Sequence, residues 1–328
     1  MIKVLFISSG NSKDGINPIV VRQGESLISN GINLEYFTIK GKGVLGYISN
    51  LYHLKDTINE FNPQILHAHY CSSAYLAILV KGRKILITSL MGDDILGSRK
   101  LNGKVTILSS VISKLNNLLS ILFFDLSIIK SNQIKLRLWS GNKEVIPNGV
   151  DIKKEFYPLD KKSAIDHVGF DSSFVNIIFV TDIKRPEKNY KLAEKAVGFL
   201  RSKGYKIYIH QVYNKTTKML NQYYNAADLL ILTSFHEGSP NVIKEAMACN
   251  TPIVSTDVGD VKWVFGETEG CYLTTYEAKD VVEKIELAIK FSCEIGRTQG
   301  RKRLISLGLD SESIAKRIIN IYKSKLKK

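Results

Sequence analysis

The stretch that decides the fold is Asp228-Leu-Leu-Ile-Leu-Thr-Ser-Phe-His-Glu-Gly-Ser-Pro-Asn-Val-Ile-Lys-Glu-Ala-Met-Ala-Cys-Asn-Thr-Pro-Ile-Val-Ser-Thr-Asp-Val-Gly-Asp260. Its apolar run 229–233 has the length of a buried strand. After a short loop, Pro240 is predicted to be the first helical residue, with Ser239 as the N-cap. A second apolar run, 253–256, follows the helix. The order strand, helix, strand predicts one βαβ unit of a parallel sheet.

Two carboxylates flank the start of this predicted helix. Glu237 lies on the loop and Glu245 lies one turn after Asn241. Backbone amides at a helix start attract anions such as a diphosphate, and carboxylates accept hydrogen bonds from sugar and ribose hydroxyls. We therefore predict that Glu237 and Glu245 hold the two ends of a sugar nucleotide. The alternative is a solvated loop and helix that carry two glutamates by chance.

Residues 237–245 resemble the E-x7-E motif of the retaining glycosyltransferases of family 4, which have the GT-B fold. The lead-in 225–228 and the exit 252–259 fit the same family. The resemblance implies an α/β chain of two Rossmann-like domains facing across a cleft. It also implies that Glu237 is catalytic and that a donor site is formed by Gly238, Ser239, Pro240, Asn241, Val242 and Glu245.

A basic loop, residues 181–190, precedes another predicted helix in the second half of the chain. Lys184, Arg185 and Lys188 cluster there, and cations beside a helix start suit a diphosphate. Lys188 matches the lysine of the family motif, and Arg185 stands in for the arginine because Thr181-Asp182 replaces the usual glycine and arginine. Lys188 and Arg185 are therefore predicted catalytic residues. The alternative is a solvated basic turn.

Two further candidates for the site lie in the first half of the chain, a glycine in a loop and a histidine near a strand end. Gly15 lies in a loop between the first predicted strand and helix, where phosphates or an acceptor often bind, although a plain turn explains it equally well. The strand 63–70 contains His67 and His69, which we expect on opposite faces. His69, nearer the strand end, is the predicted catalytic residue of the two, and a structural histidine is the alternative.

The segment Leu90–Asp94 departs from the family pattern. The family carries a T-x-H-G-x-D-like sequence at this place, and Met91 occupies the position of its histidine. That histidine's role therefore does not transfer to residue 91. Asp93 and Asp94 are adjacent and do not form the D-x-D pair that holds a metal-bound sugar nucleotide, so no metal and no cofactor is expected.

Four segments follow from the alternation of elements and from the P-N-G-V-D sequence at 147–151. Residues 1–152 are predicted to form an acceptor domain, 153–172 a linker, and 173–310 a donor domain. Residues 311–328 are predicted to form an amphipathic helix that packs back on the first domain. The apolar run 101–122 allows either a core helix or a membrane-facing helix, and the core helix is preferred.

The composition limits the classes of partner that the protein can be expected to bind. The 328 residues have 44% hydrophobic content, a net charge of +15 and only four cysteines. The pI is about 9.4. No cysteine pair has metal or redox spacing, which favours free thiols. The charge suits nucleic acid, an anionic membrane or phosphorylated substrates. Because no zinc-finger or RNA-binding signature occurs, nucleic acid is not expected.

The predicted function is transfer of a sugar from a nucleoside diphosphate sugar, such as a UDP-sugar, to an acceptor hydroxyl with retained configuration. A glycan or lipid-linked acceptor in cell-surface polysaccharide or glycolipid synthesis is expected. Two alternatives remain: a sugar-nucleotide epimerase of the same fold, and a catalytically inactive sugar-nucleotide-binding subunit. No secretory signal or transmembrane segment is expected. The predicted location is cytoplasmic, with peripheral contact to the inner face of the cell membrane.

Overall fold

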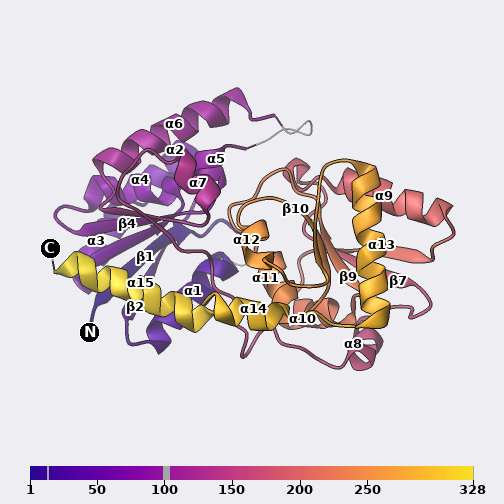
Figure 1. The fold of residues 1–328 in the computed structure, drawn as a ribbon. Coiled ribbons are helices and arrows are strands. Elements are labelled where there is room, and N and C mark those ends of the chain that lie inside the picture. Colours follow the sequence, from indigo (N-terminus) through magenta and orange to yellow (C-terminus); the bar gives the residue numbers. More distant parts are fainter. Residues whose placement is uncertain (13–14, 99–103, 328) are drawn as a thin grey trace. The chain divides into compact units, whose positions relative to one another are not determined.

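The computed structural model describes residues 1–12, 15–98 and 104–327, and the chain divides into two compact units (Figure 1). Unit 1 comprises Met1–Gly97, Thr106–Gly149 and Ser311–Lys328. Unit 2 comprises Ser98–Val105 and Val150–Asp310. In the described part of the chain, no helix combines the length and the apolar character needed to cross a membrane.

Unit 1 is built on a six-stranded parallel sheet of order β2-β1-β3-β4-β5-β6. Its strands are β1 (Lys3–Ser9), β2 (Asn33–Ile39), β3 (Ile65–His69), β4 (Ile85–Leu90), β5 (Leu126–Ile129) and β6 (Lys143–Val145). Its helices are α1 (Pro18–Ser29), α2 (Gly43–Ile48), α3 (Leu51–Phe61), α4 (Cys71–Val80), α5 (Asp93–Leu96), α6 (Ile107–Leu122), α7 (Asn132–Arg137) and α15 (Ser311–Leu326). Every residue of β3 is buried, as expected for a parallel strand covered on both faces.

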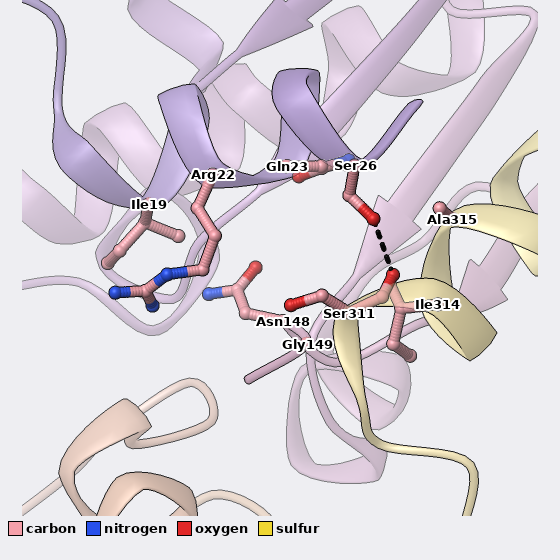
Figure 2. Close-up of a pocket in the computed structure, with 9 residues that line it drawn as sticks. All are labelled: Ile19, Arg22, Gln23, Ser26, Asn148, Gly149, Ser311, Ile314 and Ala315. Atoms are coloured by element: carbon pink, nitrogen blue, oxygen red, sulfur yellow. Dashed lines mark hydrogen bonds between the residues drawn. The ribbon is translucent and has the colours of Figure 1, made fainter. Parts of the chain in front are cut away.

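The helix α15 packs on unit 1 beside α1. Its buried apolar side chains include Ile314 and Ile318, and the buried Tyr322 hydroxyl lies 2.5 Å from His67 Nδ1. At its start, the Ser26 hydroxyl of α1 donates to the Ser311 carbonyl at 2.8 Å, as Figure 2 shows. The last helix of the sequence is therefore part of the first unit's core.

Unit 2 repeats the same architecture with five parallel strands in the order β11-β10-β9-β7-β8. The strands are β7 (Val175–Val180), β8 (Ile207–Val212), β9 (Leu229–Leu232), β10 (Ile253–Thr256) and β11 (Cys271–Thr274). The helices are α8 (Lys161–Val168), the 3₁₀ turn Pro186–Lys188, α9 (Tyr190–Ser202), α10 (Thr217–Ala226), α11 (Asn241–Ala248), α12 (Val261–Phe265), α13 (Ala278–Glu294) and α14 (Gly300–Ser306). The predicted βαβ unit is present as β9, α11 and β10.

Two parts of the chain differ from the sequence prediction. The segment predicted as a linker contains α8, whose start is capped by Asp160 Oδ1 accepting from the Ser163 amide at 2.8 Å. The run predicted as a core helix from residue 101 forms α6 only from Ile107, and residues 101–103 lie outside the described residues. The core prediction for this helix was wrong, because most of its apolar side chains are exposed.

Candidate active site

Two loops meet at the carboxyl ends of the neighbouring strands β7 and β9. The Phe235 amide donates to the Glu187 carbonyl at 2.8 Å, and the Thr233 hydroxyl donates to the Asn189 carbonyl at 2.9 Å. These bonds fasten the basic loop after β7 to the loop that carries Glu237. Ligands bind at this edge in open α/β sheets, so the fastened loops form the expected place for a site.

Lys188 and Glu237 form an ion pair across these two loops. Lys188 Nζ lies 2.6 Å from Glu237 Oε1, and the two side chains are only 12% and 15% exposed. The same carboxylate oxygen accepts from the Ser234 hydroxyl at 2.8 Å. Charge-assisted bonds of this kind are short and strong, so they hold both charged groups at fixed positions.

Arg185 has a different partner. Its guanidinium contacts Glu187 Oε1, with the Nε donating at 2.6 Å, and half of its side chain is exposed. The structure therefore pairs Lys188 with Glu237, whereas Arg185 is paired with Glu187 and does not contact Glu237 among the ion pairs of the described residues.

Glu245 lies on α11, and a buried tyrosine hydroxyl donates to its carboxylate. The residue is 7% exposed, and its Oε2 accepts from the hydroxyl of the fully buried Tyr224 at 2.8 Å. A buried donor of this kind fixes the direction of the carboxylate. Tyr224 was missed at the sequence level, because nothing in the pattern of α10 separates it from a core tyrosine.

The start of α11 differs from the prediction. Pro240 has extended backbone angles, φ −68° and ψ 118°, and occupies the N-cap position, so the helix begins at Asn241. The Ser239 hydroxyl donates to Asp260 Oδ2 at 2.6 Å and makes no capping bond. The assignment of Ser239 as N-cap was therefore wrong. Because the N-cap residue Pro240 makes no side-chain capping bond, it does not occupy the first-turn amides of Asn241 and Val242, and a helix start of this kind can bind an anion.

A buried network under the loop sets the position of Ser239. Lys244 is 1% exposed, and its Nζ donates to the Ser239 hydroxyl at 2.9 Å. Burial raises the pKa of Asp260, while the Lys244 charge and the Ser239 hydrogen bond act in the opposite direction. Lys244 was also missed, because a lysine in a helix is usually solvated.

We expect Lys244→Met to destabilise the protein by about 3 kcal/mol, because it leaves the Asp260 carboxylate buried without its cation. Urea unfolding measures this loss. The double variant Lys244→Met/Asp260→Asn should recover a large part of it, since it removes the uncompensated charge together with the cation. Equal stability of the single and double variants would show that the two groups are not coupled.

Gly259 allows the loop after β10 to approach the loop after β9. Its φ is +64°, and a Cβ built on it would lie 2.8 Å from the Gly238 carbonyl oxygen and 3.1 Å from that of Glu237. Such contacts exclude any side chain here. The Val258-Gly259 exit of the sequence motif therefore has a physical role, which is to hold the backbone of Glu237 and Gly238 in place.

The two other predicted site residues lie in unit 1. Gly15 has φ +81°, and its amide donates to the Ser12 carbonyl at 3.1 Å, while residues 13–14 lie outside the described part of the chain. His69 is fully buried, and within the part of the chain that the structure describes neither of its ring nitrogens has a hydrogen-bond partner. The expectation that His67 and His69 face opposite sides was wrong. Residues two apart in a strand share a face, and the rings stack with centroids 4.6 Å apart.

Burial makes this histidine pair a source of pH dependence. Burial and the Lys130 charge lower the pKa of His67 to about 3, and the pKa of His69 is also lowered. The unfolded chain therefore binds protons at a higher pH than the folded chain, and stability falls as the pH falls below the ordinary histidine value. As the pH falls from about 7.5 to about 5, His67 alone should lower the free energy of unfolding by about 2 kcal/mol.

Over this pH range, the free energy of unfolding in urea should fall by about 2 kcal/mol more for the wild type than for His67→Gln. Both proteins are made in a Trp263→Phe background, so that the fluorescence of Trp139 reports on unit 1. Equal losses in both proteins would show that His67 titrates alike in the folded and unfolded states.

Two cavities lie away from these residues. One, of about 20 Å³, lies between α1 and α15, has room for about one water, and is shown in Figure 2. The other, of about 710 Å³, lies beside β8 and is bordered by Phe170, Tyr208 and His210. Neither is lined by Lys188, Glu237 or Glu245, so the candidate site is defined by charge and loop geometry and does not coincide with either cavity.

Two regions of the chain match known protein families. Residues 13–121 match a family model described as glycosyl transferase 4-like, and residues 175–290 match one described as glycosyl transferases group 1. One region in each half of the chain therefore matches a glycosyltransferase family model. Lys188, Glu237 and Glu245 all lie within the second matched region.

Two curated proteins are similar over part of their length. The chain is 27% identical over 247 residues to TuaC of Bacillus subtilis (strain 168), which is named as a teichuronic acid biosynthesis glycosyltransferase. It is 31% identical over 99 residues to the N,N'-diacetylbacillosaminyl-diphospho-undecaprenol alpha-1,3-N-acetylgalactosaminyltransferase of Campylobacter jejuni subsp. jejuni (serotype O:2). These matches cover 68% and 29% of this chain, and 60% and 26% of the two relatives.

Solved structures resemble the chain over its whole length. Sucrose-phosphate synthase from Thermosynechococcus elongatus aligns with a TM-score of 0.76 at 16% identity and covers 100% of both chains. Alr3699/HepE from Anabaena, solved in complex with UDP and glucose, aligns with a TM-score of 0.75 at 16% identity, over 99% of this chain and 100% of that chain. The predicted fold class, two Rossmann-like α/β halves of the GT-B type, is confirmed.

Proposed function

We propose that the protein transfers a sugar from a nucleoside diphosphate sugar to an acceptor hydroxyl and retains the configuration at the anomeric carbon. The observation that carries this proposal is the Lys188–Glu237 ion pair beside the uncapped start of α11. It places a cation, backbone amides and a carboxylate at one edge of the sheet. These are the groups that a diphosphate and a sugar require, and they lie in a domain that matches group 1 glycosyl transferases.

Each group has a proposed role in donor binding. The Asn241 and Val242 amides and Lys188 hold the diphosphate, while Glu237 accepts hydrogen bonds from sugar hydroxyls. Glu245, fixed by Tyr224, accepts from the ribose diol. Arg185 is proposed to leave Glu187 for the diphosphate when the donor binds. The Glu237 oxygen that Ser234 and Lys188 share is thus oriented before any sugar arrives.

The proposed chemistry needs no protein nucleophile. Breaking the bond between the anomeric carbon and the phosphate oxygen leaves positive charge on the sugar and negative charge on the diphosphate. Lys188 and the helix amides stabilise the negative charge. The leaving phosphate takes the proton of the acceptor hydroxyl as the new bond forms on the same face of the sugar.

The relatives suggest the class of donor and acceptor. Alr3699/HepE was solved with UDP-glucose, which supports a UDP-sugar as the donor. TuaC is named for teichuronic acid synthesis, and the Campylobacter enzyme for a sugar linked to undecaprenol diphosphate. We therefore propose a growing polysaccharide or lipid-linked glycan as the acceptor, and we propose with it a location at the inner face of the cell membrane.

A donor panel tests this proposal. UDP, GDP and ADP and their hexose derivatives are added to the wild type, and unfolding is followed by thermal shift. A ligand at 100 times its Kd adds about 2.7 kcal/mol to the stability of the folded state. One nucleotide should stabilise the wild type by about this amount and Glu245→Ala by clearly less. If no nucleoside diphosphate or its sugar derivative stabilises the protein, the proposed donor site is wrong.

We expect activity to persist in excess chelator, because Lys188 and the α11 amides supply the positive charge that a divalent ion supplies in other enzymes. The measurement is release of nucleoside diphosphate with and without EDTA. Loss of activity that magnesium or manganese restores would overturn the metal-free mechanism, and Asp93, Asp94 and Asp257 would then need testing as ligands.

A further inference from the structure

Helix α6 faces the protein with its polar side. Ser113, Asn116, Asn117 and Ser120 recur at helical spacing, and the last three are buried. Asn116 Nδ2 donates to the Asp94 carbonyl at 2.7 Å, and Asn117 Oδ1 accepts from the Trp139 amide at 2.8 Å. These hydrogen bonds, together with the partly buried Leu119 that packs against the core, attach this face to the unit, whereas a surface helix usually relies on a wider apolar stripe.

The opposite face of α6 is apolar and exposed. The exposed fraction of its eight apolar side chains ranges from 42% for Ile112 to 86% for Ile107. They are Ile107, Leu108, Val111, Ile112, Leu115, Leu118, Ile121 and Leu122. In Figure 1, α6 runs along the outer edge of unit 1. A continuous exposed apolar face of this kind indicates a binding surface, because soluble surfaces carry such residues singly.

The surroundings of α6 are basic and aromatic. The Trp139 backbone amide donates to Asn117 on the polar face of α6, so this exposed tryptophan lies beside the helix, and the exposed Lys135, Leu136 and Arg137 lie just before it. Lys114 is an exposed charge on the helix itself. Neither α6 nor α7 contains an acidic residue, and unit 1 as a whole has 20 Lys and Arg against 10 Asp and Glu. Tryptophan and basic residues around an apolar face are typical of a membrane interface.

We propose that the apolar face of α6 inserts into the surface of an anionic lipid bilayer, with Trp139 at the headgroup level. At 16 residues the helix is about 24 Å long and lies in the plane of the interface. A second copy of the chain is a poorer partner, since it would bring the basic residues of both copies together. The inference rests on the proposed membrane location and adds the surface that makes the contact.

The test is flotation with vesicles of equal parts phosphatidylglycerol and phosphatidylcholine, at low and at high salt. The wild type should float in both, because apolar insertion resists salt while charge attraction does not. Leu115→Glu/Leu118→Glu should reduce the bound fraction at least about tenfold. The matched control Leu287→Glu/Ile305→Glu changes two exposed apolar residues of unit 2 by the same charge and should bind like the wild type.

The proposal is overturned if the wild type does not bind, if both double variants lose binding equally, or if high salt abolishes binding of the wild type. A wild-type dimer that only Leu115→Glu/Leu118→Glu converts to a monomer also overturns it, in favour of self-association. UDP-induced thermal stabilisation is measured on every variant. It reports on unit 2, so a failure of lipid binding is distinguished from a failure of the donor site.

Discussion

Replacing Lys188 by alanine should lower turnover by about 100-fold or more, the scale of losing one charge contact to a transition state. Lys188 Nζ lies 2.6 Å from Glu237 Oε1, so the change removes the cation for the leaving diphosphate and leaves a mostly buried carboxylate without its partner. The effect on turnover should exceed the effect on donor affinity. Steady-state kinetics with a saturating donor measures it.

Lys184 supplies the matched control for this experiment. It lies on the same loop and is exposed to solvent. Lys184→Ala should change turnover less than a few fold. If Arg185 leaves Glu187 for the diphosphate, the turnover of Arg185→Ala should lie between those of Lys184→Ala and Lys188→Ala. Turnover of Lys188→Ala within a few fold of the wild type would show that the ion pair is structural only.

Replacing Glu245 by alanine should weaken binding of the free nucleoside diphosphate about tenfold to 100-fold, the scale of hydrogen bonds to a charged acceptor. Glu237→Ala should leave the affinity for the free nucleotide nearly unchanged and should lower turnover. The reason is that Glu245 is proposed to contact the ribose and Glu237 the transferred sugar. Isothermal titration with the nucleotide, followed by kinetics, separates the two roles.

Tyr224→Phe provides a graded version of the same test. It removes the hydroxyl that donates to Glu245 Oε2 at 2.8 Å and keeps the buried ring. Nucleotide affinity should fall by less than in Glu245→Ala. Equal losses of free-nucleotide affinity in Glu237→Ala and Glu245→Ala would contradict the division of roles.

The sequence predicted the parts of the fold that depend on local pattern. Short apolar runs such as 229–232 are strands because both faces of a parallel sheet are covered, and the helix that carries Glu245 follows from its composition. Contact between Lys188 and Glu237 could not be predicted from spacing, since 49 residues separate them. It depends on β7 and β9 being neighbours in the sheet.

Other features escaped prediction for physical reasons. An apolar run with helical spacing gives the same pattern whether it is buried or exposed, so α6 was predicted to be a core helix although its apolar face is exposed. Ser239 has the right chemistry for an N-cap, but the buried Asp260 and Lys244 compete for its hydroxyl. The partners of Tyr224 and Lys244 are set by tertiary packing, which a single sequence does not display.

Proton NMR of the product formed from a nucleoside diphosphate α-sugar, in excess chelator, tests the central claim most directly. The account predicts release of the nucleoside diphosphate together with a product that keeps the α-configuration, and a rate that falls about 100-fold in Lys188→Ala. A β-configured product, or a sugar nucleotide converted to its epimer without release of the diphosphate, would contradict it.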